Sequence, residues 1–236
     1  MPEIDVQQCT LRTLWVLFVI AVPLFLITVS VTWAINDAGL YNGGFQKYDI
    51  SRHTGITDAD LRQTGADLRR YFNSGNEPLA VTARVYGEAR EIFSQREVSH
   101  MRDVKGLIRG VYVFAGTSLV YILAVVIGGL AGSGRMFLSQ LAGLLLKGGL
   151  LTLVLLIAFG LFAVTGFDAL FLAFHRFSFS NDLWQLDPLR DYLLIMFPFG
   201  FWFDATVRVA AAAIVGAVVL SATSGAYLLY RRLGRV

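Results

Sequence analysis

Two histidines and one carboxylate are the residues whose types and spacing are suited to chemistry. His100 and Asp103 are three positions apart in a helical pattern, so they share a helix face and the carboxylate can orient the imidazole. His175 ends a later apolar run, while the third histidine, His53, lies in a loop and receives no role. Because imidazoles gain and lose protons near neutral pH, His100, Asp103 and His175 indicate general acid–base catalysis.

Other reaction types lack their usual sequence patterns. The chain has neither the Gly-x-Ser-x-Gly nor the Ser-x-x-Lys pattern of serine acyl-enzymes, and its single cysteine, Cys9, precedes the first apolar run. A His-Glu-x-x-His spacing and a glycine-rich phosphate loop are also missing, which disfavours a zinc site and a phosphate-binding loop. We therefore expect no metal and no organic cofactor.

Membrane helices must position these residues. Of the 236 residues, 56% are hydrophobic and 16% are charged, and the mean hydropathy is +0.60, which excludes a cytosolic globular protein. About 20 apolar residues in a helix cross a bilayer core, and apolar runs without period-2 alternation favour helices over barrel strands. Four uncharged runs are long enough to cross: Leu14–Ile35, Gly110–Gly134, Gly148–Phe167 and Val209–Tyr230.

The predicted fold is an all-α polytopic membrane protein. We expect a single membrane domain over residues 1–236, with a small, mostly helical extracytoplasmic cap at 36–105. A second, aromatic outer loop is expected at 175–200, with a short interfacial helix in it. The four transmembrane helices are expected at about 12–35, 106–133, 147–174 and 201–230.

The distribution of basic residues predicts the orientation. The net charge is +3 and the pI is about 9.1, but the basic residues do not cluster on a polar domain, so nucleic acid is not an expected partner. Lys and Arg beside helix ends mark the cytoplasmic side of a membrane. Both termini are therefore expected in the cytoplasm, on the evidence of Arg12, Arg135, Lys147, Arg231, Arg232 and Arg235.

Local patterns divide the cap into smaller elements. Thr57–Asp60 resembles a capping box that opens a helix, and alternating apolar residues from Leu79 to Val85 favour a short strand that ends near Gly87. Ser94–Glu97 is a full capping box, and the apolar pattern after it runs without a break into the second membrane helix. The chain is therefore expected to enter the membrane there as a continuous helix.

The second outer loop is too aromatic for a plain solvated loop. Its residues Phe177–Trp184 include three aromatic side chains, and Asp187–Pro188 predicts an N-cap followed by a first-turn proline, opening a helix that runs to Met196. Aromatic residues at this depth also anchor helices at lipid headgroups.

Small residues four positions apart indicate close packing between membrane helices. Such pairs occur at Gly128 with Gly132 and at Ala212 with Gly216. Ordinary membrane-helix composition explains them equally well.

Polar residues gather at one expected depth, the outer headgroup level. His100 starts the second membrane helix, His175 ends the third, and Asp204 and Arg208 start the fourth. Polar groups at one depth of a bundle indicate a functional site, although solvation of interfacial turns by long basic side chains is the alternative for His100 and its neighbours.

Two stretches resemble the bacterial lipoprotein intramolecular transacylase family. They are His100-Met101-Arg102-Asp103-Val104-Lys105, and Phe174-His175 followed by Phe177, Asn181, Trp184, Asp187-Pro188, Asp191 and Phe197-Pro198. The resemblance implies a protein of the bacterial cell membrane, with its active site at the outer leaflet. It also implies transfer of the sn-2 acyl chain of a diacylglyceryl-modified N-terminal cysteine onto the α-amino group of that cysteine, which gives the lyso-form lipoprotein.

The resemblance also implies roles for individual residues. His100 is the expected base toward the amine, oriented by Asp103, and His175 is expected to stabilise the oxyanion and protonate the leaving oxygen, although the two roles can be exchanged. Diacylglyceryl-modified lipoproteins and membrane lipid are the expected partners. The expected substrate-binding residues are Lys105, Arg109 and Arg208, which add positive charge, and Phe174, Phe177, Asn181 and Trp184, which line an acyl groove.

Two other functions fit the same residues. One is an outer-leaflet lipid or lipoprotein acyl hydrolase that uses the same histidines with water as acceptor. The other is a lipid-binding scaffold without turnover, in which both histidines anchor the protein at the interface.

Overall fold

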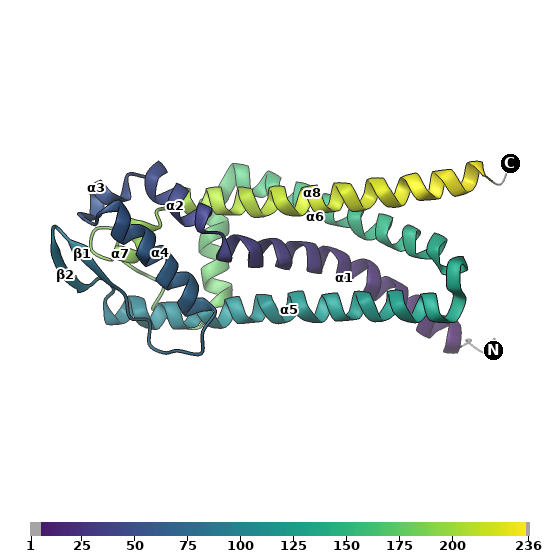
Figure 1. Cartoon of the computed structure of the whole chain (residues 1–236), viewed down its shortest axis with the longest axis horizontal. Helices are drawn as coiled ribbons and strands as arrows, with labels where there is room; N and C mark the ends of the chain where they lie inside the picture. Colours follow the sequence, from purple (N-terminus) through teal and green to yellow (C-terminus); the bar gives the residue numbers. More distant parts are fainter. Residues whose placement is uncertain (1–5, 235–236) are drawn as a thin grey trace. The chain divides into compact units, whose positions relative to one another are not determined.

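The structure is a computed structural model that describes residues 6–234, with side chains from residue 10 onward. The side chain of Cys9 and the whole of Arg235, both used in the sequence interpretation, lie outside this part. Most of the chain is helical (Figure 1). The elements in order are α1 (Val6–Asn36), α2 (Ala38–Lys47), α3 (Ile50–Thr54), α4 (Asp58–Phe72), β1 (Thr82–Val85), β2 (Glu88–Glu91), α5 (Gln95–Ser133), η1 (Gly134–Met136), α6 (Phe137–Ser178), α7 (Tyr192–Met196) and α8 (Phe199–Leu233).

The chain forms two compact units. The first, here called the apolar unit, contains the described parts of Met1–Ser30, Tyr112–Leu161 and Val209–Val236. The second, here called the polar unit, contains Val31–Val111 and Phe162–Arg208.

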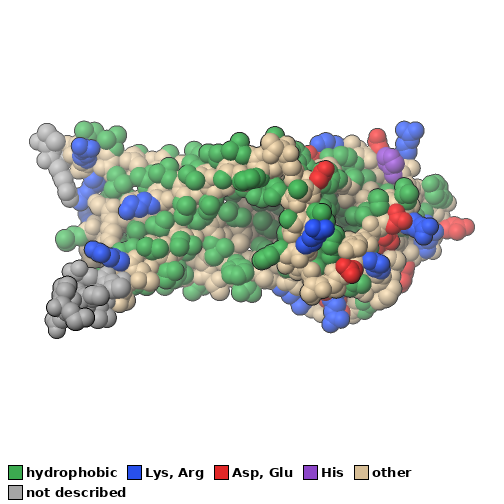
Figure 2. Space-filling model, turned by 180° about the vertical axis from the view of Figure 1, so that it is seen from behind, with side chains coloured by type: hydrophobic (Ala, Val, Ile, Leu, Met, Phe, Trp, Pro, Cys, Tyr) green, Lys and Arg blue, Asp and Glu red, His purple; other side chains and the backbone are tan. Residues whose placement is uncertain are grey.

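The long helices are apolar enough to cross a bilayer. Among the described residues, three stretches qualify by length and composition, Thr10–Asn36, Gln95–Ser178 and Phe199–Leu233. The second stretch is 84 residues long and contains α5, η1 and α6. On the face shown in Figure 2, hydrophobic side chains cover the long helices, as expected for a surface in contact with lipid.

Close helix contacts in the apolar unit differ from those that the small-residue pairs predicted. Gly128 and Gly132 face open space, so that prediction is wrong, whereas Gly216 lies against Leu26. The tighter contacts are elsewhere: a methyl group added to Gly148 would lie 2.6 Å from Val22, and one added to Gly149 would meet Ser221. Small residues allow close packing where two helices approach each other. The spacing of small residues within one helix does not show where a second helix approaches.

The polar unit has a core built around α2 and α4. Thr57 caps α4 by accepting a hydrogen bond from the backbone N–H of Asp60, which confirms the predicted helix start. Gly65 of α4 lies against Tyr41 and Phe45 of α2, so the absence of a side chain there lets the two helices meet closely.

A hairpin follows α4 in the polar unit. The predicted alternation is confirmed, because Leu79, Val81, Ala83 and Val85 are all buried while Thr82 and Arg84 are exposed. The hairpin turns at Tyr86–Gly87, and β1 pairs with β2 in antiparallel register. The sequence analysis missed β2, because all four of its residues are exposed and show no apolar alternation.

Two long helices carry the histidines. Helix α5 runs from Gln95 without interruption to Ser133, which confirms the predicted continuous helix after the Ser94 capping box. Helix α6 leaves helical geometry at Gly166 (φ −164°, ψ 47°), so the segment after this kink, residues 167–178, is a separate helical piece that ends three residues beyond His175.

The second outer loop folds differently from the sequence prediction. Asp187 caps a turn rather than a helix, because its carboxylate accepts from the N–H of Leu189 and its carbonyl accepts from Asp191. The backbone N–H of Asp187 donates to the carboxylate of Asp191, which closes the turn on itself. The helix therefore begins later, at Tyr192, with Asp191 as its N-cap residue.

Candidate functional site

The two histidines lie side by side in the polar unit. Their ring centroids are 6.3 Å apart and their planes are inclined by 31°. His100 lies in the second turn of α5 with only 6% of its surface exposed, and His175 is half-buried near the end of α6. The folded chain therefore brings together the two imidazoles that the sequence singled out for proton transfer.

A capping box forms the start of α5, the helix that carries His100. The backbone N–H of Ser94 donates to the Glu97 carboxylate at 2.7 Å, and the backbone N–H of Glu97 donates to the Ser94 hydroxyl at 3.3 Å. These bonds satisfy two N–H groups at the helix start that have no intrahelical acceptor. His100 follows Glu97 by three residues, so both side chains lie on the same face of α5.

Aromatic rings enclose the histidine pair. The ring of Phe179 meets His100 edge-on, with 5.0 Å between centroids, and Phe179 is itself buried. The centroids that lie within 6 Å of the His175 ring are those of Phe171 (4.3 Å), Trp184 (5.2 Å), Phe174 (5.3 Å) and Phe179 (5.6 Å). These rings help to bury His100 and cover part of His175, so both imidazoles have less water around them than a surface histidine.

Phe171 was not among the predicted site residues, and Phe179 was part of the predicted aromatic loop but was not singled out. Phe171 precedes His175 by four positions and Phe179 follows it by four, and helical residues at that spacing lie one above the other. The backbone N–H of Phe179 still donates to the carbonyl of His175, so the helical geometry extends that far. A search for aromatic residues four positions from each histidine would have found both.

Burial sets the protonation of the pair. His100 precedes the uncharged run that starts at Gly110, and His175 follows the one that ends at Phe167. The pKa of His100 is lowered to about 4, mainly by burial and next by the proximity of His175, and the charge of Asp103 offsets these two effects only in part. Burial also lowers the pKa of His175, against a smaller raising effect of its backbone hydrogen bond. Both rings are therefore neutral at pH 7.

One hydrogen bond fixes the tautomer of His175. Its Nδ1 lies 2.8 Å from the carbonyl oxygen of Phe171, which can only accept, so Nδ1 carries the proton. The Nε2 atom of the neutral ring then has a free lone pair and can take up a proton. In contrast, Nδ1 of His100 is buried without a hydrogen-bond partner among the described residues.

Asp103 contacts the second outer loop. Its carboxylate accepts a hydrogen bond of 2.9 Å from the side-chain amide of Asn181, while the unpartnered Nδ1 of His100 shows that the carboxylate does not hold this nitrogen. The oxygen of the Asn181 amide accepts from the N–H of Leu183, so Asn181 connects the fold of the loop to α5.

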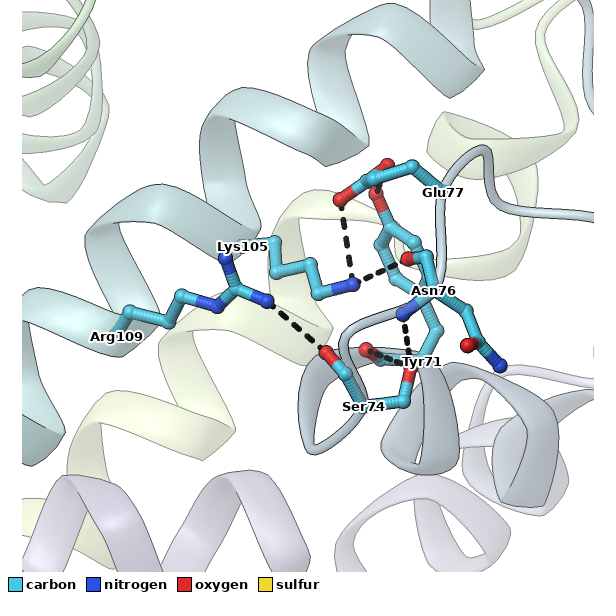
Figure 3. Close-up of polar contacts among 6 residues, drawn as sticks. All are labelled: Tyr71, Ser74, Asn76, Glu77, Lys105 and Arg109. Carbon is cyan, nitrogen blue, oxygen red and sulfur yellow. Dashed lines mark hydrogen bonds and ion pairs between the residues drawn. The ribbon is translucent and has the colours of Figure 1, made fainter.

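Lys105 and Arg109 contact the segment after α4 (Figure 3). The side chain of Lys105 is 1% exposed, and its ammonium donates to the carbonyl of Asn76 at 2.6 Å and pairs with the Glu77 carboxylate at 3.2 Å. It also lies 3.9 Å above the ring of Tyr71. Arg109 donates to the carbonyl of Ser74 at 3.0 Å. The two cations that were expected to contact substrate therefore hold the residue 74–77 segment against α5.

The remaining predicted substrate-binding residues differ in their surroundings. Arg208 pairs with Asp37 at 2.7 Å, and Phe177 is 95% exposed. Of the predicted set, Phe174 and Trp184 contact His175, and Asn181 reaches Asp103.

Comparison with known proteins gives a consistent family match. The sequence model of the family described as lipoprotein intramolecular transacylase Lit matches residues 16–202. An uncharacterized protein of Aquifex aeolicus (strain VF5) is 31% identical over 121 residues. That match covers 51% of this chain and 51% of the relative, so it spans about half the length of each.

Solved structures show the same fold. The in meso structure of the membrane integral lipoprotein intramolecular transacylase Lit from Bacillus cereus has a TM-score of 0.78 and 20% sequence identity, and the match covers 94% of this chain and 96% of that one. A structure of the Bacillus cereus protein in which one histidine is replaced by arginine has a TM-score of 0.77 and 18% identity, with 98% and 96% of the two chains covered.

Proposed function

Because the chain belongs to the lipoprotein intramolecular transacylase family, we propose that it catalyses acyl transfer within a lipoprotein at the membrane. The substrate is an N-terminal cysteine that carries a diacylglyceryl group and a free α-amino group. The sn-2 acyl chain moves to that amino group, so one amide bond forms, one ester bond breaks, and the product is the lyso-form lipoprotein. The observation that supports this reaction best is the pair of neutral imidazoles 6.3 Å apart in an aromatic enclosure.

The hydrogen bond of His175 favours an exchange of the two histidine roles. An α-amino group titrates at about 7.7–8.0, so a neutral imidazole can take its proton as the nitrogen attacks the ester carbonyl. The free Nε2 of His175 is suited to this step and, once protonated, to returning the proton to the departing glycerol oxygen. His100, which burial keeps neutral, then donates an N–H to the oxyanion.

Orientation supplies a large part of the expected rate. Ester and amine belong to one molecule, and well-oriented intramolecular reactions reach effective molarities of about 10⁵ M or more. The rings of Phe174, Phe179 and Trp184 offer the apolar surface against which acyl chains pack. No cofactor is required, because acyl transfer from an ester needs only a base and an oxyanion donor.

We also propose four membrane crossings, by the uncharged runs within α1, α5, α6 and α8, with both termini in the cytoplasm and the histidines beyond these runs at the outer leaflet. In support, η1 interrupts the 84-residue apolar stretch, Gly134 there has a positive φ of 54°, and Arg135 next to it is charged. Single cysteines in a Cys9→Ser background test the arrangement. A cysteine at Arg135 should react with an impermeant maleimide only after the membrane is opened, and one at Glu88 should react in intact cells.

Mass spectrometry of a reporter lipoprotein tests the reaction. The reporter is co-expressed with this protein in a bacterial host that lacks N-acylation, and its N-terminal lipopeptide is analysed. The expected product keeps the total lipid mass while one acyl chain moves from ester to amide, and His100→Ala and His175→Ala abolish the change. Loss of one acyl chain would indicate a hydrolase instead, and an unchanged lipopeptide with verified expression would favour the scaffold function.

A further inference from the structure

The carboxylate of Glu97 has two backbone N–H partners, one three residues away and one distant in the sequence. One oxygen accepts the N–H of Ser94, and the other accepts the backbone N–H of Leu193 at 2.7 Å, 96 positions later in the sequence. Only 1% of Glu97 is exposed and Leu193 is buried as well. A buried carboxylate is costly unless it is hydrogen-bonded, and here each oxygen has a donor.

The capping box accounts for one of these bonds only. Glutamine serves at this position of a capping box as well as glutamate does, because one side-chain oxygen is enough to accept the N–H of Ser94. The N–H groups of Ser94 and Leu193 approach different oxygens of the carboxylate, and glutamine replaces one of these oxygens with an NH₂ group, which only donates. The bond to Leu193 is therefore a second task for Glu97, and only a carboxylate performs both.

The bond to Leu193 fixes one end of the loop beside the histidines. This loop, residues 179–191, begins with Phe179, which contacts both imidazoles, and carries Trp184, which contacts His175. Near its start the loop is held to α5 by the bond from Asn181 to Asp103 and by a bond of 2.6 Å from Arg96 to the carbonyl of Asp182. Glu97 holds the chain just after the loop, at the first turn of α7.

We propose that Glu97 is a positioning residue for acyl transfer, which fixes the start of α5 against the second outer loop so that His100 and His175 keep their spacing. It acts through His100, one helical turn away, and contacts no reacting atom. The inference rests on the proposed function, because it concerns the histidines that perform it. A displacement of about 1 Å at a catalytic group can lower the rate about 100-fold. Loss of the bond between Glu97 and Leu193 should therefore have a measurable effect on kcat.

Two variants separate positioning from helix capping. Glu97→Gln keeps one acceptor oxygen where Ser94 and Leu193 now have one each, whereas Ser94→Ala loses the hydroxyl cap and keeps both bonds of the Glu97 carboxylate. With purified protein and a dipalmitoylglyceryl-cysteine lipopeptide, Glu97→Gln should lower kcat by roughly 10- to 100-fold with KM changed less than about 3-fold. Ser94→Ala should keep kcat within about 3-fold of the wild type.

Histidine modification gives a readout that needs no substrate. Diethyl pyrocarbonate reacts with accessible neutral imidazoles, and mass spectrometry gives its rate at each histidine, with the exposed His53 as internal reference. The ratio of His100 to His53 modification should rise several-fold in Glu97→Gln and stay unchanged in Ser94→Ala. If Glu97→Gln is not recovered as folded protein, Glu97→Asp, which keeps the charge with a shorter reach, should show the same changes to a smaller degree.

The outcomes distinguish a failure of the positioning role of Glu97 from a failure of the proposed acyl transfer. If kcat and the modification ratio of Glu97→Gln equal those of the wild type, or if Ser94→Ala matches Glu97→Gln in both, the positioning role is wrong. If the wild type itself does not convert the lipopeptide, the proposed function fails, and the modification ratio alone then decides whether Glu97 positions His100.

Discussion

The amide of Asn181 donates a hydrogen bond to the carboxylate of Asp103, the carboxylate that the sequence assigned to His100. The bond connects the loop that carries Trp184 to the helix that carries His100. Asp103 thus influences the site through the loop and, at a distance, through its charge.

We expect Asp103→Ala and Asn181→Ala to have similar and non-additive effects. Each should lower kcat by about 3- to 10-fold, and the double variant should be no worse than the poorer single one, because both changes remove the same bond. Lipopeptide conversion by the three purified variants measures this. A much larger loss for Asp103→Ala than for Asn181→Ala would instead show that the carboxylate orients His100 directly.

Glutamine substitutions should separate the roles of the two histidines. If His100 donates an N–H to the oxyanion, the amide of His100→Gln replaces part of that function, and its kcat should exceed that of His100→Ala by about 10-fold. If His175 accepts the proton, His175→Gln should be as inactive as His175→Ala, because an amide is not a base at neutral pH. If His175→Gln were more active than His175→Ala while His100→Gln were no more active than His100→Ala, His100 would be the base and His175 the oxyanion donor.

Acid should destabilise the protein through His100. The pKa of His100 is about 4 in the folded protein and near 6.5 in an unfolded chain, so the unfolded state binds more protons between these values. Stability should therefore fall as the pH falls from about 6.5 toward 4. Thermal unfolding in detergent from pH 7.5 to 5 should show a smaller loss of Tm for His100→Gln than for the wild type, and equal losses would contradict the buried neutral state.

Removing only the carboxylate of the Lys105–Glu77 ion pair should lower the stability of the protein more than removing both charges together. Burial raises the pKa of Glu77, but the hydrogen bonds from Tyr71 and Lys105 outweigh this effect, so the net pKa of Glu77 is lowered. Glu77→Gln leaves the buried Lys105 ammonium without a counter-charge and should reduce stability by about 1–2 kcal/mol, less than for a fully buried pair, because 35% of the Glu77 side chain is exposed to solvent. Lys105→Met combined with Glu77→Gln should recover part of that loss. Thermal unfolding measures both, and a double variant less stable than Glu77→Gln would contradict the argument.

Much of the fold could be predicted from sequence because its signals are local. Capping boxes at Thr57 and Ser94 mark helix starts through contacts three residues away, and the alternation up to Val85 marks one buried strand face. The strand Glu88–Glu91 has no buried face, so no hydrophobic pattern identifies it.

The candidate site was predictable for the histidines and less so for the cations. His100 and His175 were singled out because imidazoles are rare in this chain and both lie beside helix ends. The partners of Lys105 and Arg109 are carbonyls and a carboxylate about 30 positions earlier, in a segment with no regular pattern. The sequence shows that a basic residue lies near a membrane helix, but it does not show which groups its side chain contacts.

The loop from Phe179 to Asp191 is held at both ends, by Asp103 and Arg96 near its start and by Glu97 just beyond its end. The turn from Asp187 to Asp191 makes none of these bonds to α5, and the side chain of Leu189 within it is 87% exposed. Closing a flexible loop costs only about 0.6 kcal/mol for each doubling of its length. Extra residues inserted at Leu189 should therefore leave the histidine pair undisturbed, which makes this position the natural place for related chains to differ in length and for a reporter tag to be introduced.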